Sequence, residues 1–301
     1  MSYIPKIKIS PLPFEDSLIQ EAFQFNQLVT GPHIKIFEER LAETFGFKFA
    51  NTTSSGYSAL FLALKSLKLN KAKVVIPAIS TCHAITNAVL ANGFEVVFCD
   101  LDPNHMSLCD QSLLKLFQEN PFDAIIAPSH FGIPAPIEVY KKYGVPIIED
   151  ACQAFFTRTT IKSTADIMVL SFYPTKQFNC IEGGAILQNS IEKTKLIEDL
   201  RYYENQVSFD GTARYNLRMV NLNAAFGCLL MGNLYEERNS LLSKRDTYIN
   251  CIKNKSFLLA AQCDPGVVPW RFLIKSFNSD IFTYLKFANI QTDKEIIQLQ
   301  R

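Results

Sequence analysis

Short segments rich in β-branched and apolar residues recur along the first two thirds of the chain. They cover residues 48–53, 73–78, 94–100, 124–130, 145–150, 167–172 and 184–189. Near-continuous apolar runs of this length are typical of strands that are covered on both faces of a parallel sheet. The pattern therefore predicts seven strands.

Stretches with apolar residues at helical spacing lie between several of these strands. They cover residues 56–69, 80–92 and 134–144, and each leads into the next predicted strand. Strands that alternate with helices predict an α/β fold, with a mostly parallel seven-stranded sheet and helices on both faces. The last three strands follow one another without a full helix between them. This spacing predicts some antiparallel pairing at that end of the sheet.

The pattern changes after about residue 190, where long helices with mixed polar and apolar residues take over. One helix is expected over residues 224–254, and the segment 268–296 predicts a further strand and helix. We therefore expect a large cofactor-binding domain over residues 1–240, which includes an N-terminal arm over 1–30. A short C-terminal α+β domain is expected over residues 241–301.

Composition excludes several classes of protein. The chain of 301 residues has 30 Lys and Arg against 29 Asp and Glu, and it has no basic run that would bind nucleic acid. Its start lacks the apolar core of a signal peptide, and no apolar stretch approaches the ~20 residues that span a bilayer. The eight cysteines form no CxxC pair, which favours reduced core residues over a metal site. We expect a cytoplasmic protein without a membrane partner.

The segment SFYPTKQFNCIEGGAI, residues 171–186, contains the first candidate for chemistry. A strand ends at Ser171 and Phe172, a loop carries Lys176, and two glycines open the next strand. A lysine at a strand end could simply be solvated, so Lys176 alone would carry little weight. Two other motifs change this interpretation.

The first of these motifs is IIEDACQA, residues 147–154. Asp150 lies at the carboxyl end of a buried strand, which is the edge where ligands bind in open α/β sheets. A carboxylate there can pair with the pyridinium N–H of pyridoxal 5′-phosphate (PLP) and keep that ring electron-accepting. Gln153 could reach the phenolic oxygen of the same ring. Without Lys176, an Asp150 that merely caps the next turn is about equally plausible.

The second motif is NTTSSGYSAL, residues 51–60, which leaves the first strand and opens a helix. Small residues at a helix N-terminus let the backbone approach a phosphate group. Ser55, Gly56 and Tyr57 could supply amides and hydroxyls to it, although such residues also cap ordinary helices. Together the three motifs offer a phosphate cradle, an acid for the ring nitrogen and an amine for the aldehyde.

With these motifs in this order, the chain resembles the DegT-type family of PLP-dependent sugar aminotransferases, which have the aspartate aminotransferase-like fold (type I). The resemblance runs from LVTGPHIKIFEERLAETFG (28–46) to about residue 250 and continues through PAISTCHAITNAV and APSHFGIPAPI. It is strong again in YNLRMVNLNAAFGCLL, residues 215–230. Six motifs in the same order make chance an unlikely explanation.

The resemblance implies roles for individual residues. Lys176 corresponds to the lysine that forms the Schiff base and carries the proton, and Asp150 to the partner of the ring nitrogen. Gln153 corresponds to the contact with the phenolic oxygen. Gly56, Tyr57 and Ser171 fall at phosphate-binding positions, and Ser55 precedes them. Asn216 matches an asparagine that reaches the phosphate of the neighbouring subunit, which implies a homodimer with a shared active site.

The family also implies a reaction, a ping-pong transfer of an amino group from L-glutamate to a keto-sugar nucleotide, as in polysaccharide biosynthesis. Arg201 and Arg218 are candidates for contacts to substrate carboxylate or diphosphate groups, and surface salt bridges are at least as plausible. A sugar dehydrase of this family would have histidine in place of Lys176. A desulfurase would need a catalytic cysteine in a mobile loop.

Three features depart from the family pattern. Tyr57 stands where threonine is usual, so a hydroxyl contact to the phosphate is lost or is replaced by Ser58. Cys82 stands at a position that is often aromatic, and the neighbouring His83 could approach the cofactor instead. The region that follows FANIQTDKEI is short, so we expect an abbreviated small domain. A catalytically impaired or regulatory PLP-binding homologue, or an aminotransferase that acts on a non-sugar ketone, are therefore the alternatives.

Overall fold

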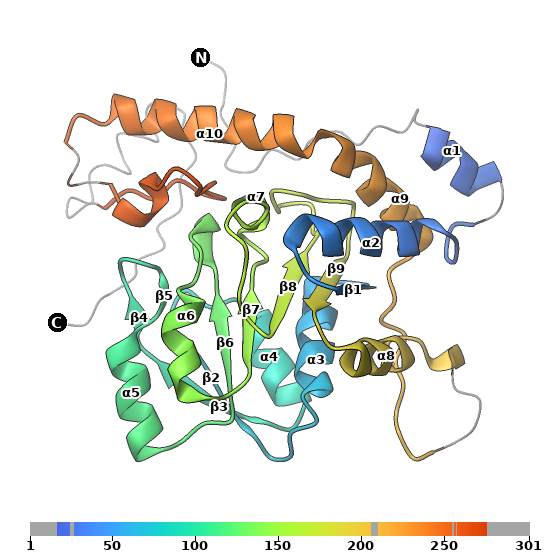
Figure 1. The fold of residues 1–301 in the computed structure, drawn as a ribbon, viewed down its shortest axis with the longest axis horizontal. Coiled ribbons are helices and arrows are strands. Elements are labelled where there is room, and N and C mark those ends of the chain that lie inside the picture. Colours follow the sequence, from blue (N-terminus) through green and yellow to red (C-terminus); the bar gives the residue numbers. More distant parts are fainter. Residues whose placement is uncertain (1–16, 25–26, 206–209, 255, 257, 276–301) are drawn as a thin grey trace.

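The computed structural model of the chain describes residues 17–24, 27–205, 210–254, 256 and 258–275. Figure 1 shows a central sheet with helices on both sides and a long helix, α10, that crosses one end of the molecule. The α-helices are α1 (Ser17–Gln24), α2 (His33–Phe45), α3 (Gly56–Ser66), α4 (His83–Ala91), α5 (Asp110–Glu119), α6 (Ile137–Tyr140), α7 (Phe155–Arg158), α8 (Ile191–Leu200), α9 (Asn221–Leu230) and α10 (Leu234–Cys251). Short 3₁₀ turns occur at His130–Gly132, Lys141–Tyr143, Tyr203–Asn205, Met231–Asn233 and Ala260–Cys263.

The main sheet contains the seven predicted strands. They are β1 (Phe49–Thr53), β2 (Lys73–Pro77), β3 (Glu95–Cys99), β6 (Ala124–Pro128), β7 (Ile147–Asp150), β8 (Ile167–Ser171) and β9 (Gly184–Gln188). Their order across the sheet is β1-β9-β8-β7-β6-β2-β3. The prediction of a mostly parallel sheet is confirmed, and so is the antiparallel pairing, because β9 runs against both β8 and β1. A two-stranded ribbon of β4 (Leu101–Asp102) and β5 (Ser107–Leu108) was not predicted.

Strand direction brings the candidate motifs to one edge. Because β9 is antiparallel to both of its neighbours, β1 runs in the same direction as β8. The pairing aligns Thr53, the last residue of β1, and Ser171, the last residue of β8, with Gly184 between them. The parallel strands β6 and β7 end at the same edge, where Pro128 pairs with Asp150. This is the edge at which open α/β sheets bind ligands.

Successive side chains of each strand point to opposite faces of the sheet and pack into two hydrophobic cores, one on each face. Ile167 and Val169 of β8 pack with α3 and α4, whereas Met168 and Leu170 pack with α2, α7 and α9. A third group of buried residues lies under α5 and α6. All five residues of β8 are buried, which explains its continuous apolar sequence.

The C-terminal region differs from the prediction in one respect. The helix expected over residues 224–254 is two helices, α9 and α10, joined by the 3₁₀ turn Met231–Asn233. Gly232 lies in this turn, and glycine costs about 1 kcal/mol relative to alanine inside a helix, which favours a break there. The predicted domain boundary at residues 240 and 241 falls inside α10. Most of the strand and helix predicted over 268–296 lies outside the described residues, so the domain division stays a prediction.

Within the described residues, every helix is too short or too polar to span a bilayer. The same residues contain no cluster of His, Cys, Asp and Glu side chains that could hold a metal ion. The eight cysteines are all free thiols, and Cys99, Cys180 and Cys228 are buried.

Candidate active site

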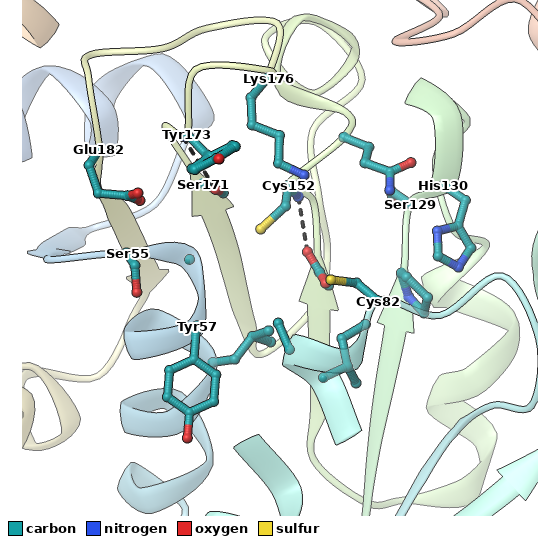
Figure 2. A pocket seen from close by; sticks show the side chains of 17 residues that line it. Ser55, Tyr57, Cys82, Ser129, His130, Cys152, Ser171, Tyr173, Lys176 and Glu182 are labelled. Carbon is teal, nitrogen blue, oxygen red and sulfur yellow. Dashed lines mark hydrogen bonds between the residues drawn. The ribbon is translucent and has the colours of Figure 1, made fainter. Parts of the chain in front are cut away.

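A cavity of about 320 Å³ lies at the edge where β6, β7 and β8 end. The N-terminus of α3 and the loops that follow the three strands enclose it (Figure 2). Seven of the eight predicted cofactor-binding residues line this cavity, namely Ser55, Gly56, Tyr57, Asp150, Gln153, Ser171 and Lys176. The eighth, Asn216, does not line it.

The first turn of α3 forms one end of the cavity. Ser55 is the N-cap of α3, and its hydroxyl accepts a hydrogen bond from the Ser58 amide at 3.1 Å. The first amides of a helix have no partner inside it, so those of Gly56 and Tyr57 are available to an anion. A Cβ on Gly56 would lie 3.0 Å from the Ser171 hydroxyl. Only glycine lets this hydroxyl lie against the helix end.

The β9 strand makes a second close approach to the same turn. A Cβ on Gly184 would lie 2.4 Å from the Ser55 carbonyl oxygen and 2.8 Å from the Gly56 nitrogen. Gly184, the first residue of β9, therefore allows the strand and the α3 turn to meet. Tyr57, by contrast, extends away from Lys176 in Figure 2, and its side chain is 38% exposed. Ser58, which the sequence offered as a possible replacement for the lost hydroxyl, is buried, bonds to Ser54 and Ser55 and does not line the cavity.

Asp150 is the last residue of β7, and it is 8% exposed at the cavity wall. One of its carboxylate oxygens, Oδ1, accepts a hydrogen bond from the Cys152 amide at 3.0 Å. A carboxylate has about four lone-pair sites, so this bond leaves capacity for a further donor inside the cavity. Asp150 is thus fixed by the turn that follows the strand, and it also faces the cavity.

Gln153 is oriented by a backbone bond. Its Oε1 atom accepts a hydrogen bond from the Phe131 amide at 2.7 Å. The Phe131 N–H can only donate, so the amide nitrogen of Gln153 is left as a donor for the cavity that it lines. A donor is the group that an oxygen anion of a cofactor would need at this place.

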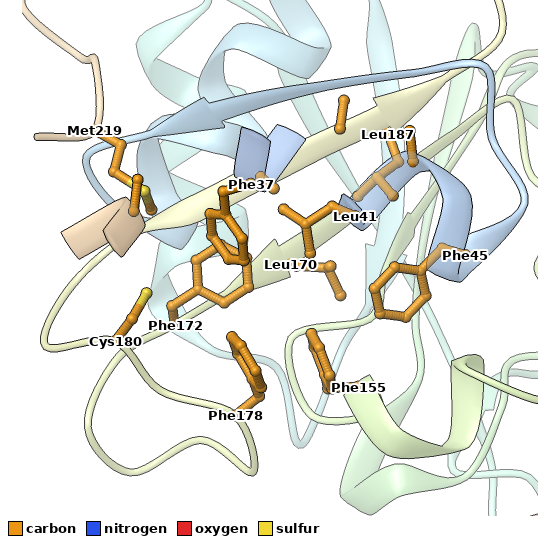
Figure 3. Packing of buried hydrophobic residues seen from close by; sticks show 14 of the residues in the cluster. Phe37, Leu41, Phe45, Phe155, Leu170, Phe172, Phe178, Cys180, Leu187 and Met219 are labelled. Carbon is orange, nitrogen blue, oxygen red and sulfur yellow. The ribbon is translucent and has the colours of Figure 1, made fainter. Parts of the chain in front are cut away.

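The loop that carries Lys176 is anchored by buried side chains on both of its flanks. Phe172 and Phe178 are 0% and 4% exposed, and their ring centroids lie 5.7 Å apart (Figure 3). Phe178 also stacks on Phe155 of α7 at 4.4 Å. Figure 2 shows the Lys176 side chain reaching from this loop into the group of cavity residues. The lysine is therefore held at the cavity by packing against the core under α2.

Several lining residues were not among the sequence predictions, and His130 is the most informative. It is 2% exposed, and its buried Nε2 atom has no hydrogen-bond partner among the residues that the structure describes. Burial lowers the pKa of His130 to about 4, while the Asp150 charge raises it and the Lys176 charge lowers it. His130 is therefore neutral near pH 7. Its position after the β6 strand, in APSHFG, was the signal that could have identified it.

Two cysteines also reach the cavity, and Figure 2 shows the sulfur atoms of Cys82 and Cys152. Burial raises the pKa of Cys152 well above its usual value, so this thiol stays protonated. His83, the alternative that the sequence left open beside Cys82, is exposed and does not line the cavity. Tyr173 and Glu182, from the loop of Lys176, complete the wall together with Ser129.

Asn216 lies near a second cavity, of about 290 Å³, which Arg201 and Arg218 line. It is exposed and accepts a hydrogen bond from Arg218, whose guanidinium stacks on Tyr202 at 4.1 Å. Arg201 pairs with Glu38 at 2.5 Å, which favours the salt-bridge alternative for this residue. Neither arginine lines the first cavity.

The donor set of the first cavity fits PLP. It combines a helix N-terminus with a serine hydroxyl for a phosphate group, a carboxylate for a ring nitrogen, and an amine for an aldehyde. The orphaned Nε2 of His130 is a further polar atom that a bound group could satisfy.

The sequence profile of the DegT/DnrJ/EryC1/StrS aminotransferase family matches residues 13–293. The chain belongs to this family. The predictions of the family, of an aminotransferase and of PLP as its cofactor are thereby confirmed. The roles of the individual residues stay predictions.

Characterised relatives are similar over most of the chain. The 3-oxo-glucose-6-phosphate:glutamate aminotransferase of Bacillus subtilis is 27% identical, and the match covers 97% of this chain and 71% of the relative. The UDP-2-acetamido-2-deoxy-3-oxo-D-glucuronate aminotransferase of Pseudomonas aeruginosa is 30% identical over 76% of this chain and 66% of the relative. The crystal structure of ntda from Bacillus subtilis, with bound cofactor PMP, matches with a TM-score of 0.77 at 25% identity, and covers 94% of this chain and 71% of that one.

Proposed function

We propose that the chain transfers an amino group from L-glutamate to a keto-sugar nucleotide, with PLP held by Lys176. The observation that carries this proposal is the single cavity in which an amine, a carboxylate, an amide and a helix N-terminus converge. The two relatives support a 3-oxo sugar as the acceptor, because both names specify one. The Bacillus subtilis name specifies a sugar phosphate and glutamate, and the Pseudomonas aeruginosa name specifies a UDP sugar, which supports the nucleotide.

We assign each group in the cavity one task. The N-terminus of α3 and the Ser171 hydroxyl hold the phosphate, since the helix end favours an anion and Gly56 lets the two approach. Asp150 accepts the ring N–H and keeps the ring protonated. The amide nitrogen of Gln153, which its bond to Phe131 leaves as a donor, faces the phenolic oxygen.

Lys176 has two tasks, to hold the cofactor and to move a proton. When bound, PLP supplies an aldehyde that condenses with amines and a ring that accepts electrons. The Lys176 Nζ atom then carries a proton between the substrate carbon and the cofactor. Lys176 can do this because its loop is anchored by Phe172 and Phe178 and cannot drift from the cavity.

We also propose that two chains share each active site. Asn216 is exposed and lies outside the cavity of its own chain, and its Oδ1 accepts a hydrogen bond from Arg218. Its amide nitrogen is the donor that would reach the phosphate of a partner. A location in the cytoplasm stays a prediction from the sequence.

The alternatives have less support. A desulfurase needs a thiolate, and burial raises the pKa of Cys152, one of the two cysteines at the cavity, so Cys152 does not supply it. Lys176 argues against a dehydrase, which would have histidine at this position. It also argues against a regulatory homologue that binds no cofactor. Whether the acceptor is a sugar or a non-sugar ketone is decided by the acceptor experiment below.

The test starts from purified protein titrated with PLP. We expect a visible absorption band, and borohydride reduction should then fix the cofactor on the peptide that contains Lys176. The matched control is Lys35→Ala, since Lys35 is 83% exposed on α2. Lys176→Ala should lose the band and the half-reaction with glutamate, and Lys35→Ala should keep both. A wild-type protein without the band would refute the proposal.

The acceptor is tested with the aminated form of the enzyme. Keto-sugar nucleotides, keto-sugar phosphates and simple 2-oxo acids are offered in parallel, and return of the visible band is followed. Turnover that is fastest with a sugar nucleotide supports the proposal. Turnover restricted to sugar phosphates or to 2-oxo acids would overturn the acceptor class while leaving the transaminase intact.

A further inference from the structure

A residue far along the chain contacts the loop of Lys176. Trp270 donates a hydrogen bond from its indole Nε1 to the carbonyl oxygen of Thr175 at 2.8 Å. The Lys176 Nζ atom lies 5.0 Å from the centroid of the same indole ring. Trp270 does not line the cavity itself, and none of the sequence motifs pointed to it. It contacts both the backbone beside the lysine and the amine of the lysine.

We propose that Trp270 is a positioning residue for Lys176, an inference that rests on the proposed function. A lysine ammonium is flexible and strongly hydrated, so an unbonded Lys176 amine would sample many positions. An aromatic face within about 6 Å attracts the ammonium and limits this sampling. The indole therefore keeps the amine near the cavity whenever it is not bonded to the cofactor, and the bond to Thr175 holds the loop backbone in register with it.

The place of Trp270 is set by its backbone as well as by its ring. Its amide donates to the Phe131 carbonyl oxygen at 2.8 Å, and the amide of Phe131 donates to Gln153. Phe131 has a left-handed backbone with a φ of 56°, which is unusual for a residue other than glycine. Phe131 thus links Trp270 to Gln153. The position of Lys176, through Trp270, and the position of Gln153 therefore both depend on the turn at Phe131.

The segment before Trp270 is docked equally closely. The Val268 carbonyl oxygen accepts a hydrogen bond from the Gln177 side chain at 2.9 Å, and the Val268 amide donates to the Thr157 hydroxyl at 2.9 Å. A Cβ on Gly132 would lie 2.2 Å from the same carbonyl oxygen. These contacts do not involve the indole, so variants of Trp270 should keep the segment in place and should fold.

The first test uses the protein without cofactor. Trp270 is the only tryptophan of the chain, so the tryptophan emission comes from the ring that Lys176 and, at 4.2 Å, the Arg271 guanidinium both approach. Lys176→Met removes the charge and keeps an unbranched side chain that is one atom shorter, and we expect it to change the emission maximum or intensity. Lys35→Met, on exposed α2, is the control and should leave the emission unchanged. Identical spectra for wild type and Lys176→Met would overturn the contact.

The second test measures the half-reaction with glutamate in single-turnover experiments. Trp270→Leu removes the ring and the N–H donor, and we expect the rate constant to fall about 5- to 30-fold, as the loss of a cation–π contact would give. Trp270→Phe keeps an aromatic face and should recover part of this loss. PLP affinity should change less than the rate constant does, because the phosphate and ring contacts remain.

The control for the second test is Phe272→Leu, in the same segment. Phe272 stacks on Tyr248 of α10 at 5.1 Å and has no ring contact to Lys176 in the described structure. If Trp270→Leu slows the half-reaction no more than Phe272→Leu does, the inference is wrong. A wild-type protein that binds no PLP would instead refute the proposed function, so the two failures are distinguishable.

Discussion

Glu149 and Asp150 are neighbours at the end of β7, and they point to opposite faces of the sheet. Glu149 is 0% exposed, lies 2.6 Å from the Arg158 guanidinium and accepts hydrogen bonds from Ser129 and Ser163. The Asp150 carboxylate accepts a hydrogen bond from the Cys152 amide, and it lines the cavity. One carboxylate is satisfied within the chain, and the other keeps capacity for a ligand.

The comparison separates a structural charge from a candidate functional one. A buried carboxylate with a complete set of partners holds elements together, here β7, α7 and the turn that contains Ser129. A carboxylate at a concave edge with spare lone pairs can bind something else. The sequence places both residues at the same strand end, so this distinction depends on the direction of each side chain.

The largest expected effect is on stability and concerns Glu149, the carboxylate that is satisfied within the chain. Arg158→Ala leaves the Glu149 charge buried without its cation, and breaking such a pair costs about 3–5 kcal/mol. Urea unfolding followed by circular dichroism measures this loss. Lys141→Ala, which breaks an exposed pair with Glu138, should cost about 0–1 kcal/mol. A folded Arg158→Ala protein that has lost all turnover would contradict a structural role.

The next effect is on catalysis and concerns Asp150, the carboxylate that lines the cavity. Asp150→Asn keeps the shape of the side chain and an oxygen for the Cys152 amide, but it removes the charge that faces the ring nitrogen. We expect the half-reaction with glutamate to slow by about 100-fold, which is typical for the loss of one charge-stabilising group. The free energy of unfolding without cofactor should stay near that of the exposed control Asp100→Asn. An Asp150→Asn protein with a large loss of unfolding free energy and normal turnover would show that Asp150 is the structural carboxylate and would contradict this prediction.

A third effect concerns His130, a buried neutral group on the cavity side. Its pKa falls from 6.5 to about 4 on folding, so between these values the unfolded chain binds more protons. Stability should therefore fall as the pH falls from 6.5 towards 4, by about 2 kcal/mol at pH 5. His130→Gln should lose this part of the pH dependence, as measured by urea unfolding at pH 7 and pH 5. His83→Gln, at an exposed site, should keep the wild-type dependence, and a wild-type slope in His130→Gln would refute the assignment.

The smallest expected effect tests whether a second chain contributes Asn216 to the cavity that Asp150 lines. Asn216→Ala should weaken PLP binding by about 10-fold, the value of one charge-assisted hydrogen bond, without a change in unfolding. Mixing Asn216→Ala with Lys176→Ala chains should restore part of the activity, because a mixed dimer has one intact site. No recovery on mixing, with mixed dimers shown to form, would rule out a shared site.

Much of this arrangement could be predicted from local sequence. Continuous apolar runs such as IMVLSF marked β8, because a strand covered on both faces has no polar side. Asp150, Lys176 and the turn at Gly56 were found because each follows a strand, and strand ends share one edge. The break between α9 and α10 was missed, since the glycine that permits it is also tolerated within helices.

Other features could not be predicted because they depend on residues that are distant in the sequence. Trp270 reaches Thr175 across 95 residues, and no local pattern records such a contact. His130 was overlooked because a buried histidine and a solvated one look alike in the sequence. The sequence left open whether the hydroxyl of Ser58 replaces the one lost at Tyr57, and hydrogen bonds to Ser54 and Ser55 hold it inside the α3 turn.

The sequence alone determined the family, the seven strands of the main sheet, and the amine, carboxylate and phosphate-binding turn, because these follow from local periodicity and short motifs. Only the tertiary structure decided which partners satisfy Glu149, which histidine and cysteines line the cavity, and which aromatic ring lies over Lys176. The physical reason is that side-chain direction at a strand end, burial and long-range docking are fixed by packing between elements rather than within them.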